Sequence, residues 1–209
     1  MTSLVLYGNR PLTSPYVFSV FVALEEKQLP FELRPLDLQR AEHHTPDYVA
    51  KSVTNRVPSL VHDGHWLSES SAITEYLEET FAPPAYARLY PEDPKERARV
   101  RMVQALIRSD FLPIREERST DTVFQGAPIE TLSERALAAV QRLYRVAGQV
   151  VPAGDRTIAA EFSIADVDLA MMLQRLLANR DPMPEPLAAY ASRIWQRPSI
   201  RKWLERLAG

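Results

Sequence analysis

The sequence of 209 residues contains no cysteine. That absence excludes disulfide bonds, thiolate metal sites and a nucleophilic or redox-active cysteine. Glycine is scarce as well, with 6 residues, and neither Gly-x-Gly-x-x-Gly nor Gly-Lys-Ser/Thr occurs, which argues against a dinucleotide-binding loop and a P-loop. No stretch approaches the roughly 20 apolar residues of a membrane-spanning helix.

The chain also lacks an excess of either charge. Twenty-seven acidic and 25 basic side chains leave a net charge of -2, so no overall field attracts nucleic acid or an anionic membrane. A hydrophobic content of 45% is typical of a globular protein, and a chain of this length buries a sizeable core. No basic stretch precedes the short apolar run at the start, unlike a signal peptide. We therefore expect a cytoplasmic protein with no nucleic-acid or membrane partner.

Proline is plentiful, with 17 residues, and proline-rich segments at 81–84 and 90–94 divide the chain. Before them, period-two and helical apolar patterns predict mixed α and β structure. The expected order is strand, helix, strand, hairpin and helix, at residues 4–7, 17–24, 31–38, 57–61 with 65–67, and from 69 onward. This order is typical of a thioredoxin-like domain over residues 1–82.

After the linker the pattern is helical, and it predicts a second, all-helical domain over residues 92–209. Asp93, Pro94 and Glu96 form a helix start, with an N-cap, proline in the first turn and an acid at N3. The expected helices cover residues 94–118, 132–150 and 164–178, with a last one that carries Ile200, Trp203, Leu204 and Leu207. Pro113 is expected to kink the first of them.

Four local patterns follow one another along the chain: Thr13-Ser14-Pro15-Tyr16 after the first strand, Asn55-Arg56-Val57-Pro58-Ser59-Leu60, Leu67-Ser68-Glu69-Ser70-Ser71-Ala72-Ile73, and Phe162-Ser163-Ile164-Ala165-Asp166. In this order and spacing they resemble the glutathione S-transferases, most closely the serine-type theta and tau classes and a bacterial branch near them. The resemblance covers nearly the whole chain. It implies an α/β thioredoxin-like N-terminal domain plus an all-α C-terminal helical domain, glutathione as cofactor, a homodimer, and a role in detoxification and stress response.

Ser14 is the catalytic candidate. Serine before proline is a good helix N-cap, and a helix N-terminus also stabilises anions. The resemblance implies that the Ser14 hydroxyl donates a hydrogen bond to the sulfur of bound glutathione and favours its thiolate. Tyr7 is the rival donor, because other classes use a tyrosine at the end of the first strand; here we favour a packing role for it.

The resemblance also assigns the glutathione-binding residues. It implies a cis peptide bond at Val57-Pro58, which turns the Val57 backbone toward the cysteinyl part of glutathione. Glu69 and Ser70, otherwise ordinary helix-capping types, match the ammonium and carboxylate of the γ-glutamyl end. His43 and Arg56 are the candidates for the glycine carboxylate, with a solvated loop as the alternative for His43. His62 and His65 have no evident third ligand, so we expect no metal site.

The second substrate of the family lies against the first helix of the helical domain. The candidates for its site are Tyr16, Arg108, Phe111, Arg115 and Arg118. A solvated helix face with i, i+3 ion pairs is the alternative for these charges. Ser163 and Asp166 form a capping box, and for them we predict a folding role.

These residues predict a glutathione S-transferase whose bound thiolate attacks an electrophilic substrate or reduces an organic peroxide. The alternative is a binding or scaffold protein of the same fold with little turnover. The presence of Ser14 and of the Glu69-Ser70 pair favours an enzyme. A thiol–disulfide oxidoreductase is excluded because it needs a cysteine of its own.

Overall fold

The computed structural model describes residues 3–126, 131–152, 154 and 156–208. The chain packs as two compact units, Met1–Leu89 with Lys202–Gly209, and Tyr90–Arg201. The last turns of the C-terminal helix therefore belong with the first unit, whereas the sequence predicted them in the second domain. No helix within the described ranges is long and apolar enough to cross a membrane.

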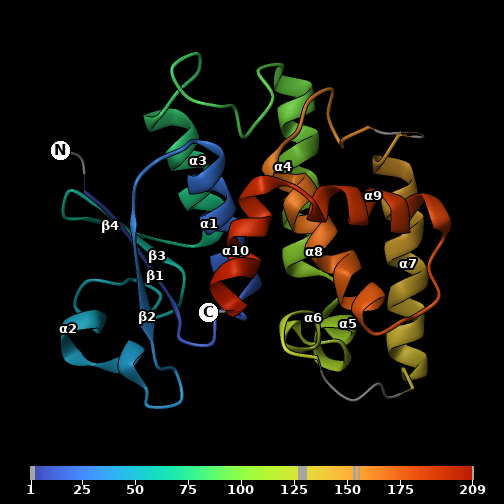
Figure 1. Ribbon diagram of the computed structural model, residues 1–209, viewed down its shortest axis with the longest axis horizontal. Helices are drawn as coiled ribbons and strands as arrows, with labels where there is room; N and C mark the ends of the chain where they lie inside the picture. Colours follow the sequence, from blue (N-terminus) through green and yellow to red (C-terminus); the bar gives the residue numbers. More distant parts are fainter. Residues whose placement is uncertain (1–2, 127–130, 153, 155, 209) are drawn as a thin grey trace. The chain divides into compact units, whose positions relative to one another are not determined.

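The first unit has the predicted alternation of strands and helices (Figure 1). Its elements are β1 (Leu4–Asn9), α1 (Pro15–Glu26), β2 (Glu32–Leu36), the 3-10 helix η1 (Glu42–His44), α2 (Pro46–Val49), β3 (Ser59–His62), β4 (His65–Ser68) and α3 (Ser70–Thr80). The sheet has the order β2-β1-β3-β4. Strand β1 pairs parallel with β2 and antiparallel with β3, and β3 pairs antiparallel with β4. The predicted strand–helix–strand unit, the hairpin and the thioredoxin-like class are confirmed.

The two faces of this sheet carry different layers. A Cβ added to Gly8 would come within 2.8 Å of a Val17 methyl group, so Gly8 lets α1 pack closely on its face. Trp203 of α10 (Pro198–Ala208) is fully buried and meets Phe18 and Phe21 of α1 edge-on. Tyr7, one residue before Gly8, points to the opposite face, where it meets Tyr48 of α2.

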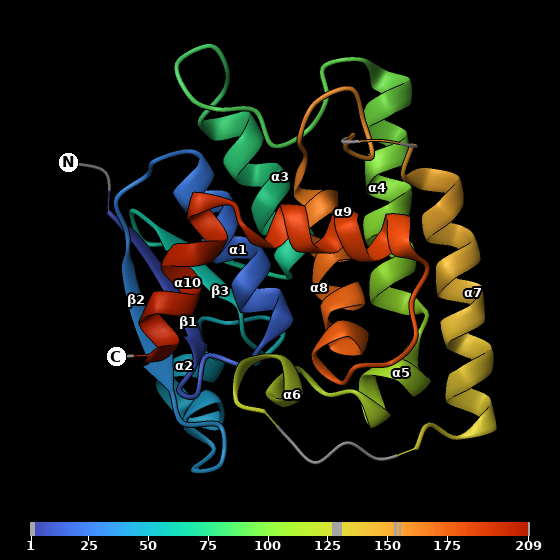
Figure 2. The ribbon, with the colours of Figure 1, turned by 45° about the vertical axis from the view of Figure 1, so that its right-hand side comes forward.

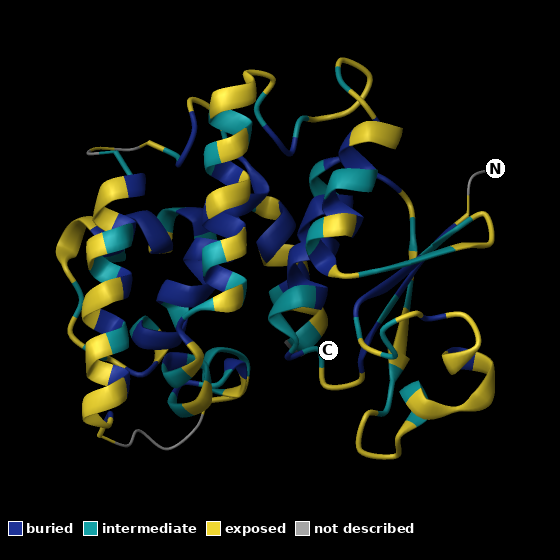
Figure 3. Ribbon diagram, turned by 180° about the vertical axis from the view of Figure 1, so that it is seen from behind, coloured by how far each residue is buried: buried dark blue, intermediate teal, exposed yellow. Residues whose placement is uncertain are grey.

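The second unit is all-helical. It contains α4 (Pro94–Ser109), α5 (Leu112–Glu117), α6 (Thr120–Phe124), α7 (Glu134–Val150), α8 (Ile164–Ala178), α9 (Glu185–Trp195) and the start of α10. Helix α8 packs against α4 and α9 (Figure 2). It is buried along most of its length, whereas α7 turns a row of exposed residues outward (Figure 3). The short helices η1, α2, α5 and α6, and α9, had not been predicted as separate elements.

Helix α8 begins at the predicted capping box. Asp166 is buried, and its carboxylate accepts hydrogen bonds from Ser163 N, Ser163 Oγ, Ile158 N and Tyr190 Oη at 2.8–3.0 Å. Burial raises the pKa of Asp166, and these four donors oppose that rise. The predicted folding role is consistent with a carboxylate whose four hydrogen-bond donors all belong to its own unit.

The prediction of one kinked helix over residues 94–118 was wrong in detail. Helix α4 ends at Ser109, and α5 begins at Leu112 after Phe111, whose φ of 60° is left-handed. Pro113 has no N–H, and its ring would clash with the carbonyl four residues earlier, on Ser109. The helix therefore stops at Ser109 instead of bending through the proline.

Candidate functional site

The predicted site residues follow or precede strands that meet at one edge of the sheet. Strands β1, β2 and β4 run in the same direction, opposite to β3. Tyr7, Ser59 and Ser68 form one rung across β1, β3 and β4, and Asn9 pairs with Leu36 at the end of β2. The carboxyl ends of three strands and the start of β3 therefore share an edge. Each predicted glutathione-site residue lies within a few residues of that edge: Ser14, His43, Arg56, Val57, Glu69 and Ser70.

Ser14 is the N-cap of α1. Its Oγ accepts a hydrogen bond from Val17 N at 3.3 Å, and its backbone N donates to Asn9 Oδ1 at 3.1 Å. Asn9 is buried, and its Nδ2 donates to Thr13 Oγ1 at 3.1 Å. Asn9 thus fixes the loop that presents Ser14. The motif pattern gave no sign of this role, because the bonds follow from the turn that joins β1 to α1.

Tyr7, the rival of Ser14, lies on the face of the sheet away from α1. Its ring stacks on Trp66 with centroids 5.1 Å apart and meets Tyr48 edge-on at 5.8 Å. Its hydroxyl accepts a hydrogen bond from Arg34 Nη1 at 3.2 Å. Its contacts are those of a packing residue, as the sequence favoured.

Glu69 and Ser70 join β4 to α3. Glu69 has a left-handed φ of 70°, which is uncommon for a residue with a side chain, and the carboxylate makes no capping hydrogen bond. It is exposed, whereas Ser70 in the first turn of α3 is buried. Glu69 therefore occupies the N-cap position without capping the helix through its side chain, and backbone strain of this kind is common at ligand sites. The Val57-Pro58 bond is cis, as the family resemblance implied.

The loops that reach this edge contain buried polar atoms without a partner. Among the described residues these include His43 Nδ1, Thr54 Oγ1 and Asn55 Oδ1. Such atoms are uncommon in folded proteins and mark sites that a ligand or water completes. Thr54 and Asn55 had not been singled out, because a lone polar residue in a loop carries no distinguishing pattern. The pKa of His43 is lowered from its ordinary 6.5, mainly by burial and then by the charge of His44.

Sequence comparison matches two family models to the chain. Residues 13–80 match the glutathione S-transferase N-terminal domain, and residues 93–208 match the glutathione S-transferase C-terminal domain. The chain belongs to the glutathione S-transferase family. Its homologues are named as enzymes, glutathione S-transferases and maleylacetoacetate isomerases, and this assignment confirms the fold and family that the four motifs predicted.

Individual relatives agree with the assignment. Glutathione S-transferase 3 of Zea mays is 32% identical, with 100% of this chain and 90% of that protein covered. Probable maleylacetoacetate isomerase 1 of Drosophila melanogaster is 31% identical, covering 88% and 74%. A glutathione transferase homolog from Burkholderia, solved with bound glutathione, has 36% identity and a TM-score of 0.80, covering 99% of this chain and 98% of its own.

The arginines predicted for the second substrate of this glutathione S-transferase are bonded within its helical unit. Arg108 Nη1 donates to Asp168 Oδ2 at 2.8 Å. Arg115 Nη1 donates to the carbonyls of Ile107 and Asp110, across the break between α4 and α5. Arg118 is buried and forms a bidentate pair with the Asp181 carboxylate at 2.7 and 2.9 Å.

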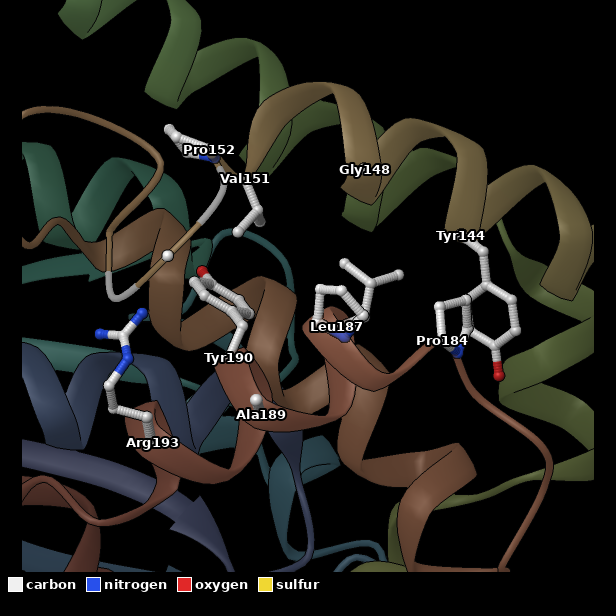
Figure 4. Close-up of a pocket in the computed structure, with 11 residues that line it drawn as sticks. Tyr144, Gly148, Val151, Pro152, Pro184, Leu187, Ala189, Tyr190 and Arg193 are labelled. Carbon is white, nitrogen blue, oxygen red and sulfur yellow. The ribbon is translucent and has the colours of Figure 1, made fainter.

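Phe111 lies at the same break and is also buried, 3% exposed. The helical unit has a pocket of about 420 Å³ elsewhere, between the end of α7 and α9 (Figure 4). Its walls include Tyr144, Gly148, Leu187, Tyr190 and Arg193, and none of the four residues predicted between positions 108 and 118. Tyr16, in the first turn of α1, is half-buried beside Ser14.

Proposed function

We propose that this family member binds glutathione at the sheet edge described above and uses its thiolate to attack an electrophile or an organic peroxide. The observation that carries the proposal is the Ser14 hydroxyl at the N-terminus of α1. Its oxygen accepts from Val17 N, and among the described residues its O–H donates to no group, so it is available to a sulfur. The positive end of the helix macrodipole favours an anion at the same place.

The glutathione-binding residues supply the remaining groups. Val57 offers its backbone N–H and C=O to the cysteinyl part of glutathione, in the manner of an added strand. Ser70 receives the γ-glutamyl carboxylate at the N-terminus of α3, and the exposed carboxylate of Glu69 receives the ammonium. His43 and Arg56 bind the glycine carboxylate. A structural relative with bound glutathione supports glutathione as the ligand.

The second-substrate residues stay predictions from the family resemblance. Tyr16 has the best support, because it is half-buried in the first turn of α1, two residues after Ser14. The internal bonds of Arg108, Arg115 and Arg118, and the burial of Phe111, give each of these residues a structural task in its own unit as well.

Calorimetric titration with glutathione, followed by a rate panel, tests the proposed function. The panel contains aryl halides, epoxides, organic peroxides and a cis-dicarboxylic maleyl compound, since several relatives are named maleylacetoacetate isomerases. We expect glutathione binding and turnover of at least one class. Absence of binding would overturn the proposal, and binding without any turnover would support the scaffold alternative.

We expect glutathione binding to draw a proton onto His43. Burial keeps the pKa of free His43 below 6.5, whereas a bound carboxylate stabilises the imidazolium and raises that pKa. Affinity should therefore increase as the pH falls from 8 through the pKa of the complex, and level off below the pKa of the free protein. S-methylglutathione is the ligand to use, because it lacks the thiol proton. Titrations in buffers of different ionisation enthalpy measure the proton uptake.

In this experiment His43→Asn should remove the proton uptake. His65→Asn is the matched control, because His65 is exposed on the β3–β4 hairpin, and it should keep the wild-type uptake. Equal uptake in wild type and His43→Asn would assign the carboxylate to Arg56 instead.

We also propose that the protein is a homodimer, as the family resemblance implies. The chain has a mass of 23.8 kDa, so light scattering coupled to size-exclusion chromatography should give twice that value at micromolar concentration. A single-chain mass across that range would contradict the dimer and would leave the glutathione site unaffected.

A further inference from the structure

Four side-chain hydroxyls, on Tyr48, Ser52, Ser59 and the half-buried Ser68, form a hydrogen-bonded group, which we call the hydroxyl cluster. Tyr48 Oη lies 2.9 Å from Ser59 Oγ, and the three serine oxygens lie 3.2–3.3 Å from one another. Tyr48, Ser52 and Ser59 are 4%, 2% and 0% exposed. The four residues come from α2, the loop after it, β3 and β4, so the cluster joins segments up to 20 residues apart.

At one end of the cluster, the hydroxyls donate to a backbone carbonyl, which can only accept hydrogen bonds. The carbonyl oxygen of Arg56 lies 3.0 Å from Tyr48 Oη and 3.2 Å from Ser59 Oγ. Each hydroxyl can both donate and accept, but a carbonyl only accepts. The chain of hydrogen bonds therefore points toward Arg56, and each bond strengthens the next in a buried setting. The Arg56 carbonyl belongs to the peptide bond that carries the Val57 N–H.

At its other end, the cluster includes Ser68, which precedes the proposed binding residues Glu69 and Ser70. Ser68 is the last residue of β4 and directly precedes Glu69 and Ser70. Its Oγ lies within hydrogen-bonding distance of Ser52 and Ser59. One buried network thus holds the backbone before Val57 and the backbone before Glu69 at a fixed separation.

We propose that Tyr48 is a positioning residue, which sets the spacing of the Val57 and Glu69-Ser70 segments for a γ-glutamyl peptide through the hydroxyl cluster. The proposal rests on the proposed function, since it takes those segments as the glutathione contacts. Buried hydroxyls gain little stability over apolar groups that fill the same space, but their directional bonds fix a geometry. Ser14 lies outside the cluster, so Tyr48 acts on binding and leaves the thiolate to Ser14.

Two further observations support this role. The Tyr48 ring meets Tyr7 and Trp66 edge-on, with centroids 5.8 and 5.7 Å apart, so a phenylalanine would keep the packing and lose only the hydroxyl. Burial raises the pKa of Tyr48, more than its bonds to Ser59 and Ser52 lower it. The hydroxyl therefore keeps its proton, and remains a donor to Arg56, throughout the pH range of the assays.

The test compares Tyr48→Phe with wild type. We expect KM for glutathione and Kd for S-methylglutathione to rise about five- to tenfold, the effect of one lost hydrogen bond. We expect kcat at saturating glutathione to stay within about twofold, and the pKa of the bound thiol to stay at its wild-type value. Ser52→Ala should shift KM in the same direction by a smaller factor. A general structural defect would lower kcat as well.

Tyr76→Phe is the matched control. Tyr76 Oη bonds His62 Nδ1 at 2.7 Å in the same unit but does not belong to the cluster, so this variant should keep the wild-type KM. A folded Tyr48→Phe protein with the wild-type KM would overturn the positioning role alone. A changed thiol pKa would do so too, because it would place Tyr48 at the thiolate. If Tyr48→Phe does not fold, an unchanged KM in Ser52→Ala overturns it. Failure of wild type to bind S-methylglutathione would overturn both this inference and the proposed function.

Discussion

Replacing Ser14 with alanine should raise the pKa of the bound glutathione thiol by about one to two units. A hydrogen bond to a charged group contributes about 1.5–3 kcal/mol, and one pKa unit corresponds to about 1.4 kcal/mol. Since an ordinary thiol titrates near pKa 8.5, the variant should hold mostly thiol at neutral pH. Conjugation at pH 6 should therefore fall roughly ten- to a hundredfold, and the deficit should shrink above pH 9. Thiolate absorbance in the complex, followed across pH, measures the shift.

The controls separate this effect from loss of a helix cap. Ser133 is the N-cap of α7, where its Oγ accepts from Ala136 N at 3.2 Å. Ser133→Ala should cost about 1 kcal/mol of stability, as a lost cap does, and leave the thiol pKa unchanged. Ser14→Thr keeps a hydroxyl at the cap and should restore most of the thiolate. An unchanged thiol pKa in Ser14→Ala would show that Ser14 does not stabilise the thiolate, and would leave Tyr7 as the candidate donor.

Replacing Lys27 with methionine should destabilise the first unit by about 3–5 kcal/mol, because it removes one partner of a buried ion pair. Lys27 Nζ donates three hydrogen bonds of 2.8 Å, to Glu78 Oε2 and to the carbonyls of Phe81 and Ala87. The side chains of Lys27 and Glu78 are 0% and 3% exposed. The pair connects α1 to α3, the two helices whose first turns carry Ser14 and Ser70. Urea unfolding followed by near-UV circular dichroism measures the loss.

Helix α1 also supplies the control for this prediction, through Glu25. Lys202 and Glu25 form a second Lys–Glu pair, in which the lysine side chain is 57% exposed. Exposed pairs contribute about 0–1 kcal/mol, so Lys202→Met should change the free energy of unfolding little. Adding Glu78→Gln to Lys27→Met removes the charge of the buried carboxylate and should recover part of the loss. If Lys27→Met and Lys202→Met lowered the free energy of unfolding equally, burial would not make the Lys27–Glu78 pair the more stabilising of the two.

Elements with their own start and stop signals were predictable from the sequence. Helix α8 has the predicted bounds, 164–178, because the Ser163–Asp166 box and an apolar run are both local. Helix α4 begins where Asp93 and Pro94 predicted. Its end at Ser109 was missed because Pro113 stops the helix four residues earlier, where its ring would clash with the Ser109 carbonyl. Helix α9 was missed because Pro184 and Pro186 resemble a loop, although proline fits the first turn of a helix.

The candidate site likewise contains residues that local motifs predict and residues that only the fold brings together. The motifs made Ser14, Val57, Glu69 and Ser70 candidates, because each of these residues belongs to a short run of residue types next to a strand or a helix start. They did not identify the hydroxyl cluster, because a tyrosine and three serines spread over residues 48–68 form no pattern until β3 and β4 pair.

The absence of cysteine was decided by the sequence alone, and it excludes thiol chemistry by a side chain of this protein. The sequence also determined the family and, in the first unit, the order of the strands and of the two longer helices, since these depend on local residue patterns. Only the tertiary structure decided which distant groups meet. Lys27 and Glu78 are 51 residues apart, and nothing near either residue marks it for burial. A buried charge or hydroxyl is stable only beside its partner, and the fold supplies that partner.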